Sequence, residues 1–223
     1  MSKTFMRWIF RIASISILLP ASFSNAAPRA TAPKAPVIYG FKGAQLGMSL
    51  QDLYNLPIEV ADTKPASLAC SNTQEGRRQG AISSIEEDEI GIVVCQYRLN
   101  AGSDTSRATI RIGRGYTDNV NFRFYDGQLF KIYIEAGKRE YDEAVDGLVA
   151  KYGDPDLARV EEAESTNGQT FSHEIMTWEN SSNSVVASEP WVFGGGSVIF
   201  RDYLIERKMK LDLNSKYPSD KKM

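Results

Sequence analysis

The fold of this chain is decided by residues 120–135, which read VNFRFYDGQLFKIYIE. Apolar and polar residues alternate on both sides of Asp126-Gly127, a pattern typical of strands that bury one face. Asp-Gly is a strong two-residue hairpin turn, because glycine accepts a positive φ there. The stretch therefore predicts an antiparallel hairpin whose buried face carries Val120, Phe122 and Phe124.

The same alternation predicts further strands on both sides of this hairpin, and they cover residues 93–99, 108–112, 175–179, 184–188, 198–201 and 204–211. Two helices are also expected. Ser49 and Asp52 form an S-x-x-D cap ahead of a short helix. From Glu140 to Tyr152 apolar residues recur at spacings of three and four, and Gly153 and Pro155 mark the end of this second helix.

The order of these elements suggests an internal duplication. A helix, several strands and a hairpin occur twice, and FYDGQL at 124–129 lines up with FRDYL at 200–204 after one deletion. We therefore expect an α+β fold of two tandem units, each with one helix packed on an antiparallel sheet. The units would span residues 37–136 and 137–212, followed by a basic tail at 213–223.

The first residues have the pattern of a targeting signal. Lys3, Arg7 and Arg11 form a basic start, and the uncharged stretch that follows is too short to span a bilayer. Small residues at Ser24-Asn25-Ala26 predict cleavage after Ala26, which makes residues 1–26 a signal peptide and the Pro-rich residues 27–36 a tether. The protein is thus expected in the periplasm or outside the cell, with no stable membrane anchor.

Export determines how the two cysteines are interpreted. In an oxidising compartment Cys70 and Cys95 are expected to form a disulfide. The alternative is a reactive thiol, which needs a basic partner close by, and the chain has a single histidine, His173.

Composition argues against several classes of function. The chain of 223 residues has 26 Lys+Arg against 28 Asp+Glu, a net charge of -2, so it lacks the global positive field that favours nucleic acid. With one histidine and two cysteines, we expect no metal, no cofactor and no catalytic residues. The acidic runs 86–89 and 161–164 are interpreted as solvated loops, His173 as a surface or pairing residue, and Gly194–Ser197 as a hairpin linker.

Strand phase gives the candidate binding site. One set of residues is expected to face the helix: Val93, Ala108, Ile110, Phe122, Phe124, Phe130 and Ile132. The opposite set is strongly basic: Arg98, Arg107, Thr109, Arg111, Arg123, Lys131 and Tyr133. These residues form either a solvated sheet face or a recognition surface for an acidic protein segment or an anionic envelope polymer. Trp191 and Phe193, in a glycine-rich loop, are further binding candidates or core residues.

The stretch LGMSLQDLYNL at 46–56 resembles the start of small exported proteins that include outer-membrane assembly lipoproteins of the SmpA type. The tandem order of helix and sheet, with a disulfide, is similar to the beta-lactamase inhibitory protein fold. The second unit has no cysteine pair, and no lipid-bearing cysteine follows the signal. The resemblance implies a binder or inhibitor that acts through a sheet face, and it carries over no individual residue.

The sequence therefore predicts an exported, non-catalytic binding protein, either an inhibitor of a periplasmic enzyme or an accessory of envelope assembly. The competing hypothesis is a periplasmic hydrolase that uses scattered carboxylates. A deep pocket with two converging carboxylates would favour the hydrolase, and a shallow basic sheet would favour the binder.

Overall fold

The structure is a computed structural model, and it describes residues 37–57, 59–62, 64–99, 106–164, 168, 170–189 and 195–216. Every described residue belongs to one compact unit, Pro36–Met223. The predicted signal peptide and tether therefore lie outside the described residues, as does the end of the predicted tail. Within the described part, no helix is both long enough and apolar enough to cross a membrane.

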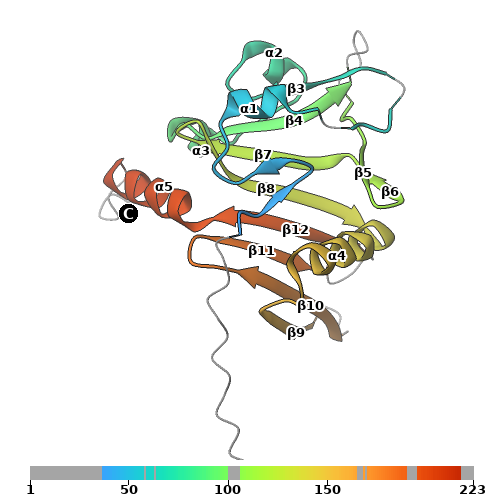
Figure 1. The fold of residues 1–223 in the computed structure, drawn as a ribbon. Coiled ribbons are helices and arrows are strands. Elements are labelled where there is room, and N and C mark those ends of the chain that lie inside the picture. The colour runs from blue at the N-terminus through green and yellow to red at the C-terminus, as the bar shows by residue number, and fades with distance from the viewer. Residues whose placement is uncertain are drawn as a thin grey trace, which may run out of the picture. The chain divides into compact units, whose positions relative to one another are not determined.

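An eight-stranded antiparallel sheet dominates the fold, with strand order β3-β4-β7-β8-β12-β11-β10-β9 (Figure 1). Its strands are β3 Ala66–Cys70, β4 Val93–Leu99, β7 Asn119–Tyr125, β8 Gln128–Gly137, β9 Leu157–Glu164, β10 Thr170–Glu179, β11 Asn183–Ser188 and β12 Gly195–Asp202. Two small sheets pair β1 Gly40–Phe41 with β2 Ala44–Gln45 and β5 Ile110–Ile112 with β6 Gly115–Thr117. The helices are α1 Leu50–Asn55, α2 Gln74–Arg78, α3 Ile85–Glu89, α4 Lys138–Tyr152 and α5 Tyr203–Lys216. The predicted α+β class is confirmed.

Both predicted helices are present. Ser49 and Asp52 form a reciprocal capping box at α1, in which the Ser49 hydroxyl accepts from the Asp52 amide at 3.1 Å. Helix α4 ends at Gly153, whose φ of 84° is the positive value that glycine adopts most easily. A Cβ at Gly196 on β12 would lie 2.1 Å from Tyr141 Cδ2, so this glycine lets α4 pack closely on the sheet.

The Asp126-Gly127 hairpin is also confirmed. Tyr125 pairs with Gln128, and the turn residues have φ values of 49° and 73°. The register shifts between Arg123 and Phe124, so Phe124 pairs with Leu129 instead of Phe130. As a result, Phe130 points to the opposite side of the sheet from the one expected. The prediction that Phe130 faces the helix is therefore wrong, because this bulge reverses the expected phase.

The main core lies between the sheet and the helices α1 and α4, which cover the same face in Figure 1. Phe122, Ile132 and Trp178 are fully buried there, together with Leu53 of α1 and Leu148 of α4. We call this side of the sheet the core face. Cys70 and Cys95 lie opposite each other on β3 and β4 within this core and form a disulfide with an S–S distance of 2.05 Å.

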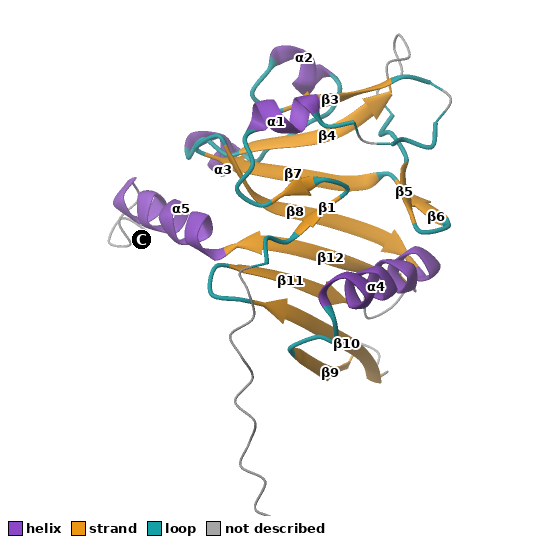
Figure 2. Cartoon of the chain, viewed as in Figure 1, coloured by secondary structure: helices purple, strands orange, loops and turns teal. Residues whose placement is uncertain are grey.

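Two segments differ from the expectation. The predicted strand 204–211 is part of α5, where Asp202 Oδ1 accepts from the amides of Leu204 and Ile205 at 2.9 and 3.0 Å and so caps a helix. The acidic run 86–89 lies in α3 instead of a loop, because Ser84 and Glu87 form a second capping box. Figure 2 shows α3 and α5 at the same end of the large sheet.

Helix α5 covers one end of the second side of the sheet, which we call the open face. Its Ile205 and Met209 pack against a separate apolar cluster formed by Ile92, Val94, Tyr125 and Phe130. Tyr125 also hydrogen-bonds Asp212, and Lys216 Nζ donates to the Glu89 carbonyl of α3. Helices α3 and α5 therefore border the open face at this end.

Candidate binding face

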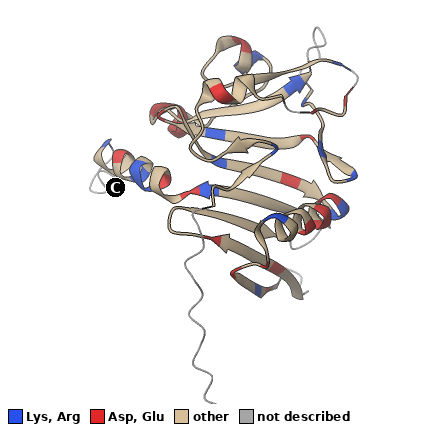
Figure 3. Cartoon of the chain, viewed as in Figure 1, with Lys and Arg blue, Asp and Glu red and all other residues tan. Residues whose placement is uncertain are grey.

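Three cations lie side by side on the open face, on the neighbouring strands β7, β8 and β12. Arg123 on β7 pairs directly with Lys131 on β8, and Lys131 pairs with Arg201 on β12. Directly opposed residues of antiparallel strands point to the same face, about 5 Å apart. We call Arg123, Lys131 and Arg201 the basic row. Figure 3 shows blue Lys and Arg segments on neighbouring strands of the large sheet, at the end nearest α5.

The three cations differ in how they are neutralised. Arg123 forms an ion pair and hydrogen bond with Glu87 of α3, whose side chain is only 19% exposed. Lys131 and Arg201 make neither an ion pair nor a side-chain hydrogen bond with any residue that the structure describes. The Arg201 Nε is buried without a partner, and Lys131 is half-buried. Positive charge is thus left unpaired at the β8–β12 side of the row.

The surroundings of Lys131 disfavour its charged form. Burial lowers the pKa of Lys131, and the neighbouring charges of Arg201 and Arg123 lower it further. Glu206 of α5 and Glu87 act in the opposite direction without reversing the shift. A bound anion would remove the unfavourable repulsion in this row.

A different arrangement occupies the adjacent part of the open face. Asn121 Nδ2 donates to Asn119 Oδ1 at 3.0 Å, and Asn119 Nδ2 donates to Glu135 Oε2 at 2.5 Å. Asn121 in turn accepts from Gln96 on β4. We call these four residues the polar ladder. The side chains of the polar ladder hydrogen-bond one another. They therefore have fewer free hydrogen-bonding groups and less unpaired charge to offer a ligand than the basic row has.

The predicted basic residues do not all reach one surface. Arg98 lies on the open side of β4, but it is only 7% exposed, and its Nη2 donates to Gly80 O and Gln96 Oε1, both at 2.6 Å. Burial lowers the pKa of Arg98, and the nearby Arg107, which forms a β-bridge with it, lowers it further. Arg98 is therefore a structural tie between β4 and the turn after α2.

The prediction is wrong for Arg111. This residue lies on the separate β5–β6 sheet, where its Nε donates to Gly113 O at 3.0 Å. Ile110, its neighbour, is buried in the main core, so Arg111 points away from that core and does not join the basic row. A strand phase counted along the sequence could not show that β5 leaves the large sheet.

Tyr133 lies on the open face as predicted and pairs with Ile199 of β12, which in turn pairs with Val186 of β11. These three partly exposed residues form an apolar strip next to the basic row. The Tyr133 hydroxyl lies 3.4 Å from Glu135 Oε2, and burial, followed by the Glu135 charge, raises the pKa of Tyr133. Trp191 and Phe193 lie outside the described residues.

Arg201 is the site residue that the sequence interpretation missed. It was assigned to a strand, and alternation with Val198 and Phe200 could have placed it on the open face. The sequence does not show that Arg201 lies next to Lys131, because β12 pairs with β8 although the two strands are far apart in the chain.

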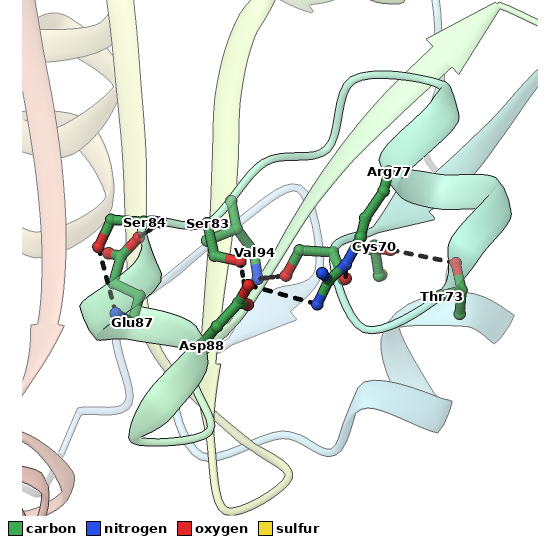
Figure 4. Close-up of polar contacts among 9 residues, drawn as sticks. Cys70, Thr73, Arg77, Ser83, Ser84, Glu87, Asp88 and Val94 are labelled. Carbon is green, nitrogen blue, oxygen red and sulfur yellow. Dashed lines mark hydrogen bonds and ion pairs between the residues drawn. The ribbon is translucent and has the colours of Figure 1, made fainter.

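Helix α3, which supplies Glu87, is fixed to the first strands by polar contacts (Figure 4). Arg77 Nη2 lies 3.3 Å from Asp88 Oδ2, and the Arg77 Nε donates to the Ser71 carbonyl. The Ser71 hydroxyl accepts from the Val94 amide at 3.1 Å. These contacts hold α3 beside β4 and so position Glu87 against Arg123.

The residues that were weighed for catalysis lie on two parts of the fold: the acidic run 86–89 lies in α3, and His173 and the acidic run 161–164 lie on β10 and β9. His173 is buried, and its Nε2 lies 3.9 Å from Glu161 Oε2 on the neighbouring strand, so of the two expected roles the pairing role fits and the surface role does not. The acidic run 161–164 belongs to strand β9 instead of a loop. The described residues contain no group of three or more His, Cys, Asp and Glu residues that could hold a metal ion.

A family model described as the TP0088 domain matches residues 84–208. The match begins at the N-cap of α3 and ends within α5, so it contains Glu87 and the whole basic row. No curated protein and no solved structure matches the chain. Because the family match covers more than half of its length, the chain belongs to the TP0088 domain family.

Proposed function

We propose that this protein is a non-catalytic binding protein that recognises an acidic segment of a partner protein through the basic row. The observation that carries the proposal is the pair of adjacent, partly buried and unneutralised cations Lys131 and Arg201. Keeping two desolvated like charges together has a free-energy cost, which a carboxylate between them would offset. Arginine also offers a forked set of donors that fits a carboxylate.

The apolar strip favours a protein partner over an anionic polymer. Val186, Ile199 and Tyr133 cross three strands beside the basic row and are all partly exposed. A protein segment can place an apolar side chain on this strip and a carboxylate on the row at the same time. Interfaces commonly combine an aromatic anchor with flanking arginines in this way.

The proposal includes an exported protein with two related halves. The basic start and small-residue cleavage pattern of residues 1–26 support export, and the buried Cys70–Cys95 disulfide is compatible with an oxidising compartment. The strand order is symmetrical about the β8–β12 pairing, with β3-β4-β7-β8 on one side and β9-β10-β11-β12 on the other. This symmetry supports the tandem units and the likeness to inhibitory and envelope-assembly proteins.

The test compares two double charge reversals in the native chain. Lys131→Glu with Arg201→Glu changes the basic row, and Arg111→Glu with Arg114→Glu makes the same charge change on the β5–β6 sheet. The probe is a fluorescent glutamate-rich peptide that also contains tyrosine, and its affinity is measured by anisotropy. We expect at least a tenfold loss for the first variant and little change for the second.

Rising salt should weaken peptide binding to the native protein, because at 1 M ionic strength screening shortens to about 3 Å. Equal losses in the two double variants would mean that overall charge governs binding, and would contradict a role for the basic row. Thermal unfolding of both variants shows whether either loss reflects misfolding.

A further inference from the structure

A cavity of about 220 Å³ lies on the core face, between α4, the β1 strand and the β5–β6 sheet. Its walls are mostly apolar and include Phe41, Ile112, Ile134, Leu148, Val198 and Phe200. Five of these six residues are buried core residues, so the cavity extends from the surface into the main core. None of the residues of the basic row lines it.

The walls are held in place by contacts with α4. The Tyr152 hydroxyl accepts from the Gly40 amide and donates to the Gly40 carbonyl, both at 3.2 Å, which fixes β1 against the end of the helix. The Arg114 amide donates to the Glu143 carboxylate, which fixes the β5–β6 turn against the same helix. The cavity is therefore preformed, and its nearest polar side chains are already engaged.

The mouth of the cavity is formed by exposed residues that leave it open. Gly147 is in the middle of α4, where glycine makes a helix less stable than alanine does. A Cβ at Gly147 would meet no atom within 4 Å, so no close packing at this position requires a glycine. Because Gly147 lines the cavity, we expect a large side chain at this position to obstruct its opening.

The charge at the mouth is positive. Lys42 and Lys151 both line the cavity, and neither forms an ion pair with a carboxylate in the described part of the chain. Lys151 Nζ lies 4.8 Å from the centre of the Tyr152 ring and 3.5 Å from Gly40 O. The third charged residue, Glu143, is occupied by the Arg114 amide. An anionic group would therefore be attracted to the two lysines.

We propose that this cavity binds a fatty acid, with the alkyl chain between α4 and the sheet and the carboxylate at Lys42 and Lys151. The apolar walls offer no free hydrogen-bonding side chains to a sugar or a nucleotide, whereas each methylene of an alkyl chain buried there adds to the affinity. The volume suits part of one chain, which excludes a phospholipid with both of its chains inside. The site is separate from the open face and does not depend on the proposed partner.

The test titrates the native chain by calorimetry with three probes: laurate below its micelle concentration, dodecanol and butyrate. Laurate should bind, and butyrate, which has the charge without the chain, should bind at least tenfold more weakly. Replacing both lysines by glutamine should weaken laurate binding severalfold and leave dodecanol binding unchanged. Absence of laurate binding, or equal binding of laurate and butyrate, would overturn the proposal.

Gly147→Leu is the variant that closes the mouth, and Ala150→Leu, at an exposed position of the same helix that does not line the cavity, is its matched control. We expect at least a tenfold loss of laurate affinity for Gly147→Leu and no loss for Ala150→Leu. Equal affinities of these two variants would overturn the assignment. A measurement on the native protein is independent of either variant: a nitroxide-labelled fatty acid should broaden the methyl signals of Leu148 and Val198. Broadening of the Ile205 signals alone would place the ligand elsewhere.

Discussion

The two faces of the large sheet are built from the same strands but meet opposite demands. On the core face Phe122, Ile132 and Phe200 occupy neighbouring strands and are at most 2% exposed. At the position next to each of these residues in the sequence, the open face carries Arg123, Lys131 and Arg201. The core face has its partners within the chain, whereas part of the open face does not.

This difference separates stability from recognition. Residues of the core face contribute by burial, and their removal leaves a cavity. The unpaired cations of the open face add little to stability and impose a cost, because partial burial disfavours their charge. The same segment of chain can therefore change its binding surface without changing its fold.

The largest expected effect comes from substitutions that remove buried side chains from the main core. Ile132→Ala and Leu148→Ala should each lower the free energy of unfolding by about 2–5 kcal/mol, since both side chains are buried in the main core. Urea unfolding followed by far-ultraviolet circular dichroism measures the loss. An unchanged midpoint with an unchanged slope would show that the assigned core face is wrong.

The next largest effect is expected from the disulfide, which also lies in the main core. Replacing Cys70 and Cys95 together by alanine should lower the free energy of unfolding by about 3 kcal/mol, because the bond closes a loop with a sequence separation of 25. Urea midpoints of the variant and the native chain provide the comparison. A variant as stable as the native protein would show that the bond does not restrict the unfolded chain as expected.

The smallest effect concerns the open face. Lys131→Met should change stability by less than about 1 kcal/mol, in the stabilising direction, because water still screens the half-buried charge that it removes. A loss of several kcal/mol would contradict the description of Lys131 as an unpaired cation.

The pH dependence sharpens this test. The pKa of Lys131 is lowered from 10.5, so between the folded-state pKa and 10.5 the unfolded chain binds more protons than the folded chain. Stability of the native chain relative to Lys131→Met should therefore rise with pH across that window, which narrows the difference between the two. Urea midpoints at pH 7 and at alkaline pH measure it, and comparison with the variant cancels the tyrosines that titrate in the same range.

Local sequence signals were enough to predict elements whose hydrogen bonds and turns involve only residues close together in the chain. The apolar spacing and Gly153 predicted α4, and the Asp126-Gly127 pair predicted its hairpin. The Ser84 and Glu87 capping box of α3 was present in the sequence in the same form as that of α1, but the acidic run around it was interpreted as a solvated loop. In α5, Asp202 and the spacing of Ile205 and Met209 were available signals for a helix.

The rest depended on long-range pairing. The pairing of β8 with β12 brings Lys131 to Arg201, and the packing of α3 brings Glu87 to Arg123. The register shift before Phe124 turns Phe130 to the other face of the sheet, and the alternation of apolar and polar residues gives no sign of this shift. Strand phase therefore predicted two of the three residues of the basic row, Arg123 and Lys131, but it could not predict that Glu87 neutralises Arg123.

Strand β9 lies at one edge of the sheet and pairs with β10 alone among the described strands. An unpaired strand edge can add strands from other molecules and so start aggregation. Arg159, Glu161 and Glu162 lie along this edge, with Arg159 Nε 2.8 Å from Glu161 Oε1. A second copy that added its own β9 here would bring these carboxylates together and lose their hydration. The charges of the acidic run on β9 therefore disfavour edge-to-edge growth of this sheet.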